Sequence, residues 1–383
     1  MRFESEGYEY KKRVTPDLSD KAFRIGDGRI SGYLSMFLGI ISLLAVLAYQ
    51  YPSYLTTADL RAAYDAEFLQ DVLMYCMWIS LGFGLLTFIL NKRKRMGATG
   101  VLCTLLAFAL GGYHIPTGPV EPSQLSFGLD WLLLAFVASA AVFIFIEKVF
   151  PKYREQIITR PEWKLDMIYF IVNHLLITVL LLVANYFFTK VFSWAISADL
   201  QAFVQSQPLW LQVIMLVLAA DFVLYWSHRL YHEVPSLWNI HAVHHSVEYM
   251  DWLAGSRNHI VQTFSDRIIA IVPLYLIGPD KAALDIYVSF AAFQAVYVHA
   301  NVNIPLGPLQ YILVTPKFHH WHHSSQKPAI DTNYSVHTPL FDKLFNTYHM
   351  PKEHWPSHYG TVPRIPRTFF QQLFYPFSKG NKK

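Results

Sequence analysis

The sequence predicts an all-α fold, in which a polytopic bundle of membrane helices carries a helical cap on its cytoplasmic side. The first observation is composition: 53% of the 383 residues are hydrophobic and only 15% are charged, whereas a soluble domain is about one quarter charged. The second is a series of apolar runs close to the ~20 residues that a helix needs to cross a bilayer. The third is the placement of basic residues beside these runs.

Six apolar runs precede the first histidine-rich segment, and each is predicted to cross the membrane. Two later runs, 260–277 and 282–298, are interrupted by charged residues. We expect these two to form a shallow hairpin or interfacial helices, because charges are costly inside the bilayer. The six predicted crossings are residues 30–51, 70–90, 98–113, 128–145, 165–188 and 209–226.

Lysine and arginine are concentrated in alternate connections between the runs. They cluster in residues 11–29, 92–95 and 148–164, whereas the intervening connections hold almost none. Because positively charged connections stay in the cytoplasm, this alternation places the N-terminus inside and predicts an even number of crossings before His228. The histidine-rich segments and the C-terminus are therefore expected on the cytoplasmic face.

Charge and cysteine content exclude several classes of protein. The net charge of +4 is small and the basic residues lie beside apolar runs, so nucleic-acid binding is not predicted. The two cysteines, Cys76 and Cys103, lie within apolar runs and predict neither a disulfide framework nor a CxxC metal site. No serine elbow or phosphate-binding glycine loop is present to build another kind of active site.

The histidines form three regularly spaced clusters between His228 and His337. Their spacings, i, i+4 and i, i+3, i+4, put two or three imidazoles on one helix face, as a multi-ligand metal centre requires. A single zinc site needs about four ligands, so eight indicate two metals. The eight are His228, His232, His241, His244, His245, His319, His322 and His323.

Two residues upstream share a helical stripe with the first cluster. Asp221 and Tyr225 precede His228 and His232 at spacings that put all four on one face. An acidic residue near the end of an apolar run is a functional candidate, because its burial is expensive. We expect the Asp221 carboxylate to accept an imidazole N–H and so fix the tautomer of a metal ligand.

Several histidines stand outside the three clusters. His299 ends an apolar run near the cytoplasmic boundary, and His259 lies close to the same face, so both are candidate ligands. His320 points away from His319 on their common helix and is expected at the surface. The remaining downstream histidines are interpreted as ordinary polar residues; they are His337, His349, His354 and His358.

Imidazole ligands suit iron, copper or zinc. Two irons could activate O2 for attack on a C–H bond, a reaction that needs no protein nucleophile because the cofactor supplies the chemistry. A site at the membrane interface could receive lipid chains from the bilayer and electrons from a separate donor. A metal-ion transporter is an alternative, although its polar residues should lie along a path through the membrane. A structural zinc-binding membrane protein is another, although eight ligands exceed one closed site.

The histidine-bearing segments resemble the fatty acid hydroxylase/sterol desaturase superfamily. The match runs over roughly residues 205–350, with its motifs in the same order and spacing. It is carried by HxxxH at 228–232, HxxHH at 241–245, Arg257-x-His259, His299-x-Asn301, HxxHH at 319–323 and Asn333-Tyr334.

The resemblance implies a membrane enzyme that hydroxylates or desaturates a lipid of sterol or fatty acyl type. It implies two iron ions, replaceable by zinc, with O2 and a separate electron donor such as a cytochrome b5-like protein or a ferredoxin with its reductase. A pterin-dependent ether-lipid (alkylglycerol) monooxygenase would use the same motifs. Asn303 stands where some lipid hydroxylases have a second histidine, which argues against the sphingolipid branch. The implied ligands are His228, His232, His241, His244, His245, His259, His299, His319, His322 and His323.

These expectations divide the chain into four parts. Residues 1–29 form a cytoplasmic tail and residues 30–204 form the N-terminal transmembrane helices. Residues 205–350 form the catalytic domain implied by the resemblance, and residues 351–383 form a C-terminal tail.

Overall fold

The regular structure of the chain is helical. The computed structural model describes residues 29–57, 61, 65–92, 94–116, 120, 128–352 and 354–378. Throughout these residues only isolated bridge pairs occur besides helices, so the predicted all-α fold is confirmed. The tail expected at residues 1–29 lies outside the described residues except for Arg29. The chain divides into two compact units, which are treated separately here.

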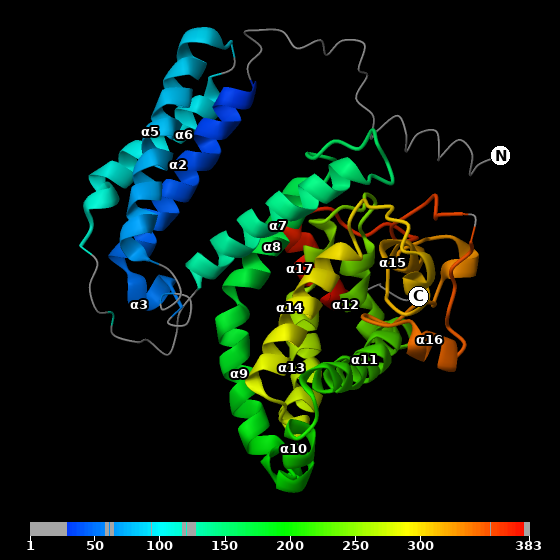
Figure 1. The fold of residues 1–383 in the computed structure, drawn as a ribbon. Helices are drawn as coiled ribbons and strands as arrows, with labels where there is room; N and C mark the ends of the chain where they lie inside the picture. The colour runs from blue at the N-terminus through cyan, green and yellow to red at the C-terminus, as the bar shows by residue number, and fades with distance from the viewer. Residues whose placement is uncertain are drawn as a thin grey trace, which may run out of the picture. The chain divides into compact units, whose positions relative to one another are not determined.

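The N-terminal unit comprises residues 17–137 and 174–179 and is built on three helices (Figure 1). Small residues let these helices approach closely, as expected for helix pairs in membranes. The Ser35 and Ser80 hydroxyls each donate to the other's carbonyl oxygen at 2.8 Å. A Cβ at Gly39 would lie 2.4 Å from the Gly100 carbonyl oxygen, so this crossing requires glycine. The helices are α2 (Arg29–Gln50), α5 (Ala66–Leu90) and α6 (Arg95–Ala109), with the short α3 (Pro52–Leu55).

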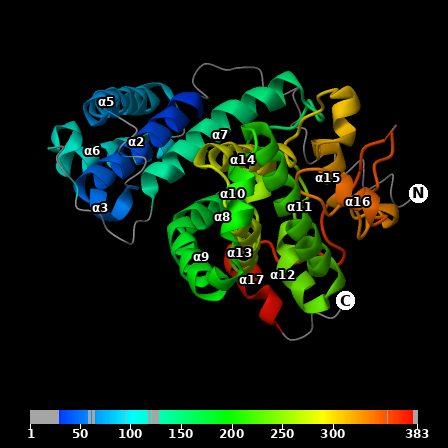
Figure 2. The same cartoon turned by 60° about the horizontal axis from the view of Figure 1, so that its bottom comes forward.

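The second unit, here the histidine unit, comprises residues 138–173 and 180–383 and holds every histidine cluster. Its frame is α11 (Leu209–Glu233), which packs against α13 (Ile260–Ile277) and α14 (Lys281–Tyr297) (Figure 2). With 25 residues, α11 is about 37 Å long, enough to cross a bilayer. The unit also contains the C-terminal half of α7 (Leu129–Val149) and most of α8 (Trp163–Leu175) and α9 (Ile177–Val191). Its remaining helices are α10 (Ala198–Gln205), α12 (Pro235–His245), α15 (Pro316–His322), α16 (Leu340–Leu344) and α17 (Phe369–Phe374).

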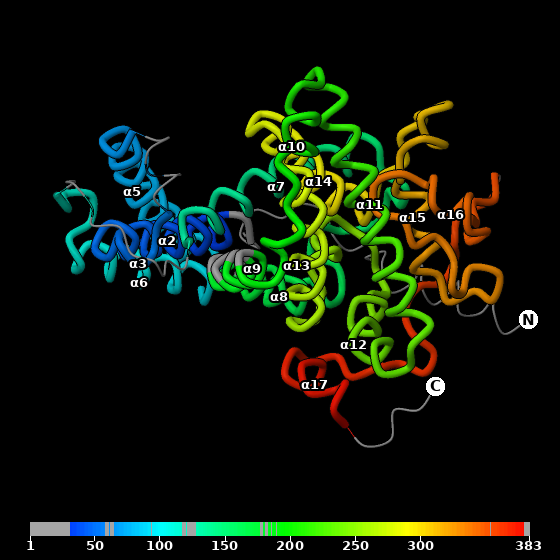
Figure 3. The backbone as a smooth tube through the Cα atoms, turned by 90° about the horizontal axis from the view of Figure 1, so that it is seen from below, coloured from blue at the N-terminus to red at the C-terminus, as the bar shows by residue number. Residues whose placement is uncertain are grey.

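The C-terminal segment packs against the helix that carries the second histidine cluster. Figure 3 shows α17 beside α12, at the end of α11. The Gln372 amide of α17 donates to the Ser246 hydroxyl just after α12 at 3.2 Å. Val243 of α12 packs in a buried cluster with Leu165 and Ile365. Ile365 and Gln372, which lie in the segment expected as a C-terminal tail, therefore contribute to the core of the histidine unit.

Six helices in the described part of the chain are long and apolar enough to cross a membrane: α2, α5, α6 with its extension to His114, α7, α11 and α13. The predicted multi-pass membrane protein is thus confirmed, although α13 lies in a run that was expected to form a shallow hairpin or an interfacial helix. The run at 165–188 differs from its prediction, because α8 ends at Leu175 and α9 begins at Ile177. The buried Asp166 carboxylate near the start of α8 is bonded to Arg257, which ties α8 to the histidine-bearing segments.

Candidate metal centre

Nine histidines gather into two groups in which the candidate ligand nitrogens lie within 4.8 Å of one another. Eight are buried, and His228 is half-buried. The five-histidine group is His228, His232, His241, His245 and His322, and the four-histidine group is His244, His299, His319 and His323.

Two short helices, α12 and α15, carry most of these imidazoles, and each helix begins at a proline. α12 follows α11 after the single residue Val234 and starts with Pro235 at its first position. α15 starts with Pro316, preceded by Thr315, whose hydroxyl accepts the Phe318 N–H at 3.3 Å. Proline suits the first turn of a helix because its missing N–H is not needed there. Each helix then carries at least two of its histidines in its last turn, where the negative end of the helix dipole favours a cation.

The outer nitrogen of several ligand candidates is committed to a hydrogen bond. The partners are carbonyl or carboxylate oxygens, which cannot donate, so Nδ1 must carry the hydrogen. Each Nε2 then keeps its lone pair, and second partners of this kind are typical of metal-binding imidazoles. The pairs are His228 with Tyr334 O (2.7 Å), His232 with Asp331 Oδ1 (3.2 Å), His241 with Gln262 Oε1 (3.0 Å), His244 with Arg257 O (3.1 Å), His299 with Ala295 O (2.9 Å) and His322 with Thr332 O (2.8 Å).

The inner nitrogens converge on one another. Nε2 of His228 lies 3.0 Å from Nε2 of His241, and Nε2 of His299 lies 3.2 Å from Nε2 of His244. Both members of each pair have committed Nδ1 as the donor, so two lone pairs face each other across each gap. Two nitrogens bound to one ion at about 2.1 Å and at right angles would stand about 3 Å apart. The arrangement fits a metal ion in each group. Because neither Nε2 of a pair carries a hydrogen, a hydrogen bond between the two rings does not explain the short distance.

Electrostatics favour the ligating form of these side chains. Burial, followed by the neighbouring imidazoles, lowers the pKa of His241, His244 and His245 well below the usual value. The three rings are therefore neutral at physiological pH, which is the form that binds metals. The Nε2 of His322 is buried without a hydrogen-bond partner. A buried polar atom in that state is costly, and a metal ion would satisfy it.

Three candidate site residues lie outside the two groups. His259 caps α13 by accepting the Val261 N–H at 3.2 Å, and its Nε2–H donates to the Leu373 carbonyl at 3.0 Å. The Asp221 carboxylate accepts three backbone N–H groups of residues 336–338 at 2.8–2.9 Å, rather than an imidazole N–H. The Tyr225 hydroxyl bonds the Thr347 hydroxyl at 3.0 Å. In the structure, Asp221 and Tyr225 thus fasten α11 to the segment that supplies Tyr334.

Gln262 is a site residue that the sequence analysis missed. Its Oε1 accepts the Nδ1–H of His241, while its Nε2 donates to Asp266 Oδ2 at 3.1 Å. Because the carboxylate can only accept, Asp266 fixes the orientation of the amide and leaves its oxygen for His241. The i, i+4 spacing of Gln262 and Asp266 is the only signal that the sequence offers for this pair.

A buried ionic network, also missed, supports the four-histidine group. The Arg257 carbonyl receives the Nδ1–H of His244, and the Arg257 guanidinium binds Asp166 of α8 at 2.5 Å. Arg160 binds Asp166 and Asp251, both at 2.6 Å, and all four side chains are at least 95% buried. A charge left unpaired at this depth would cost several kcal/mol. The network therefore holds the 251–257 segment against α8.

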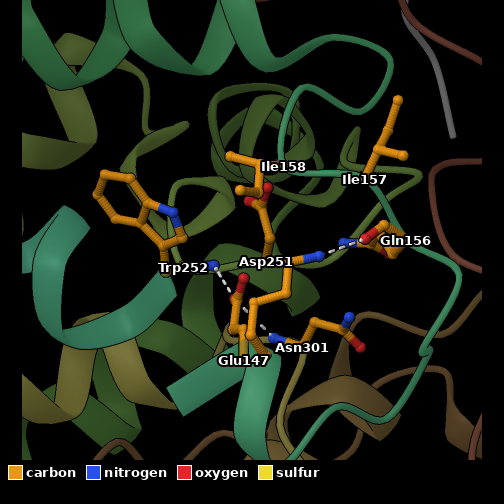
Figure 4. Close-up of a pocket in the computed structure, with 8 residues that line it drawn as sticks. Glu147, Gln156, Ile157, Ile158, Asp251, Trp252 and Asn301 are labelled. Carbon is orange, nitrogen blue, oxygen red and sulfur yellow. Dashed lines mark hydrogen bonds between the residues drawn. The ribbon is translucent and has the colours of Figure 1, made fainter. Parts of the chain in front are cut away.

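The carboxylate of Glu147 holds the chain just after His299 in place. Figure 4 shows Glu147 of α7 between Trp252 and Asn301. Its Oε1 accepts the backbone N–H of Trp252 at 2.7 Å and that of Asn301 at 2.9 Å. The Asn301 side chain in turn accepts the Tyr153 N–H at 2.8 Å. The loop that follows His299 is thereby fixed to the end of α7.

His320 is buried, so the expectation that it lies at the surface is wrong. Its side chain points away from the two histidine groups, but other parts of the chain cover it, and its exposed fraction is 0%. The Nε2–H donates to the carbonyl oxygens of His299 (3.3 Å) and Ala300 (3.2 Å), and Nδ1 accepts from the Tyr359 hydroxyl at 3.0 Å. Burial lowers its pKa to about 3, so the ring is neutral.

The helices long enough to cross a membrane and the two buried histidine groups define a multi-pass membrane protein with two sites that could hold metal ions. Residues 213–347 match the fatty acid hydroxylase family. The matched segment is the one whose histidine motifs resemble the fatty acid hydroxylase/sterol desaturase superfamily.

The curated relatives are named as enzymes that modify lipids or long-chain aldehydes. Ornithine lipid hydroxylase OlsE of Rhizobium tropici is 35% identical over 176 residues, which are 46% of this chain and 53% of that protein. Alkylglycerol monooxygenase of Danio rerio is 35% identical over 131 residues, 34% of this chain and 29% of that protein. Very-long-chain aldehyde decarbonylase GL1-5 of rice (Oryza sativa subsp. indica) is 26% identical over 138 residues, which are 33% of this chain and 22% of that protein. The matches span about half the length of these relatives or less, and no solved structure matches the chain.

Proposed function

We propose that this chain is an O2-dependent, membrane-bound lipid oxygenase that holds two iron ions and hydroxylates or desaturates a lipid. The observation that carries the proposal is the pair of adjoining, buried, all-imidazole groups whose inner lone pairs converge. The relatives named as a lipid hydroxylase and as monooxygenases support the reaction class.

The proposed ligands are the five-histidine and four-histidine groups, with His259 outside them. Iron held there would supply the activation of O2 for attack on an unactivated C–H bond. The protein's own contribution is to keep Nε2 of six of the nine histidines free for a metal through their Nδ1–H bonds, and to keep water away by burial. Asp221 and Tyr225 act as positioning residues in this proposal, because they touch the supporting segment and no ligand nitrogen.

The histidine groups are proposed to face the cytoplasm. The alternation of basic connections supports this orientation. His228 and His232 lie at the C-terminal end of α11, so both groups gather at one end of a span-length helix. A lipid could then reach the site from the bilayer, while electrons arrive from a separate cytochrome b5-like or ferredoxin-type protein. A transporter is disfavoured, because the candidate ligands do not line a path along the helices.

A second candidate reaction is cleavage of an ether lipid by a pterin-dependent monooxygenase. The 35% identity to an alkylglycerol monooxygenase over 131 residues favours including it. The same metal centre would serve both reactions, and they differ in the reductant. A requirement for a reduced pterin that a protein donor cannot replace would select the ether-lipid reaction.

The test is oxygen transfer by the purified protein. Iron-loaded protein in lipid nanodiscs would be given a lipid extract of its own cells, 18O2 and a reductant, and the lipids would be analysed by mass spectrometry. We expect a lipid that gains one 18O atom, or one that loses two hydrogens, only when O2 and iron are both present. His244→Ala should abolish the product, and the matched control His114→Ala, which changes an exposed histidine outside both groups, should not. Unchanged lipids with every reductant would contradict the proposal.

A further inference from the structure

His320 is a buried imidazole that the proposed metal centre does not use. It follows His319 directly in the chain, and its Nε2–H donates to the backbone carbonyl of His299 at 3.3 Å. His319 and His299 both belong to the four-histidine group. His320 is therefore joined to two candidate ligands, to one through a peptide bond and to the other through a hydrogen bond.

On its outer side, His320 meets a half-buried tryptophan. The rings of His320 and Trp355 are 5.3 Å apart at an interplanar angle of 83°. Trp355 also carries a cation on its ring, with Lys152 Nζ 4.9 Å from the ring centroid. A continuous series of contacts thus runs from the half-exposed Trp355 through His320 to the four-histidine group.

The chain around Trp355 is rich in cations. The Tyr153 hydroxyl bonds the Pro356 carbonyl, Lys317 Nζ donates to the Lys352 carbonyl, and the Ser357 N–H donates to the Gln326 side chain. These contacts bring segments 151–155, 326–327 and 354–357 together with Lys317 and Lys352. By sequence they contain five lysine or arginine residues and Glu155, and Glu353 follows Lys352 in the chain. We call this surface the Trp355 face; its members are Lys152, Arg154, Lys317, Lys327, Lys352 and Trp355.

The cations of this face repel one another. Burial, and then the charge of Lys317, lowers the pKa of Lys152. Burial likewise lowers the pKa of Lys317. Within the described part of the chain, no ion pair involves a basic residue of the face. Basic residues that outnumber the nearby glutamates are complementary to an acidic partner surface, which would speed its association and fix its orientation.

We propose that the Trp355 face is the docking site of an acidic one-electron donor protein, and that Trp355 and His320 form the electron route to the four-histidine group. This inference rests on the proposed function. Hydroxylation consumes O2, one substrate C–H bond, two electrons and two protons, and yields one C–OH group and water. The donor delivers the two electrons in two encounters, so a small, salt-sensitive interface suits it. Anionic lipid is the other polyanion that lysines attract, but it would make no use of the contacts from Trp355 inward.

Docking can be measured without metal. Metal-free protein in neutral nanodiscs would be tested for binding to two acidic probes, the soluble domain of cytochrome b5 and a plant-type ferredoxin, at low and at physiological ionic strength. We expect Lys152→Glu/Lys317→Glu to weaken binding to at least one probe about tenfold and to flatten its salt dependence. The control pair Lys190→Glu/Lys281→Glu makes the same charge change at exposed positions outside the face and should bind as the wild type does.

The electron route through Trp355 and His320 is tested separately from the docking site. In iron-loaded protein with saturating reduced probe, Trp355→Leu should slow electron transfer from the probe about tenfold or more while leaving reduction by a small neutral mediator unchanged. Trp194→Leu, at a tryptophan that is 82% exposed, is the control. If the charge-reversed pair and the control pair bound the probes with equal affinity, the proposed docking site would be overturned. It would also be overturned if the charge-reversed pair lost affinity only for phosphatidylserine vesicles. An unslowed Trp355→Leu would overturn the route. Wild-type protein that accepts electrons from neither probe nor mediator would instead refute the proposed function.

Discussion

At the scale of single residues, the centre depends on groups that orient imidazoles. Six ligand candidates donate Nδ1–H to an oxygen, and four of the acceptors are backbone carbonyls. Any side chain at those acceptor positions supplies the same carbonyl, so its identity carries no information about the site. Gln262 is different, because it uses its side chain and can be tested by substitution.

Gln262→Leu should weaken metal binding by the five-histidine group. The change removes the acceptor that fixes the tautomer of His241, and the loss of such a partner costs about 10–100-fold in metal affinity. Competition with a chelator, followed by metal analysis, would measure the effect. Gln212→Leu is the matched control: Gln212 is equally buried, but it bonds Asp280, so that variant should lose stability and keep its metal. Equal chelator resistance of Gln262→Leu and wild type would contradict the assigned role.

His337 should make the fold sensitive to acid. Burial lowers its pKa to about 4, from an ordinary value of about 6.5. Between these values the unfolded chain binds a proton that the folded chain does not, so the unfolding free energy falls as the pH falls, by about 1.4 kcal/mol per pH unit. His337→Gln should therefore lose less melting temperature between pH 7 and pH 5 than the wild type does, measured in detergent. Identical pH dependence would show that His337 is not held neutral.

At the scale of elements, sequence patterns predicted the helices and the histidine clusters, but not what braces them. The i, i+3, i+4 spacing located eight of the nine grouped histidines, because one helix face is a local property. His299 needed a separate argument from its place at the end of an apolar run. The Asp166–Arg257 pair joins segments 91 residues apart, and the burial of His320 depends on Trp355, 35 residues away; spacing within one helix reveals neither.

Asp221 belongs to this scale, because it ties α11 to the loop at 336–338. Asp221→Asn replaces one acceptor oxygen with an NH2 group that faces backbone N–H donors, which should cost about 2–3 kcal/mol of stability. The folded fraction should retain nearly wild-type metal content, because no ligand nitrogen bonds Asp221. Thermal melting and metal analysis of the same sample would separate the two effects. The control Asp285→Asn, at an exposed pair with Lys281, should change stability by less than about 0.5 kcal/mol. Loss of metal without loss of stability would restore the role expected from sequence.

At the scale of the whole molecule, the account requires both histidine groups and the C-terminal segment to lie on the cytoplasmic side. Single cysteines at Ser206 and Ser357, in a chain whose Cys76 and Cys103 are replaced by alanine, would report sidedness. Both serines are exposed, and Ser206 precedes the N-terminal end of α11. An impermeant thiol reagent should label Ser206→Cys in intact cells and Ser357→Cys only after permeabilisation. The reverse pattern would overturn the orientation.

The central claim is that one chain holds two metal ions in two groups of imidazoles. The most direct measurement is the metal content of protein purified in mild detergent from iron-rich cells, with the same analysis of His241→Ala and His319→Ala. The account predicts about two ions per chain, mainly iron, for the wild type, and a loss in each variant, which removes a ligand from one group. Zinc at the same stoichiometry that iron replaces on reconstitution would agree with it. Wild-type protein that retains no tightly bound metal, before or after reconstitution, would contradict it.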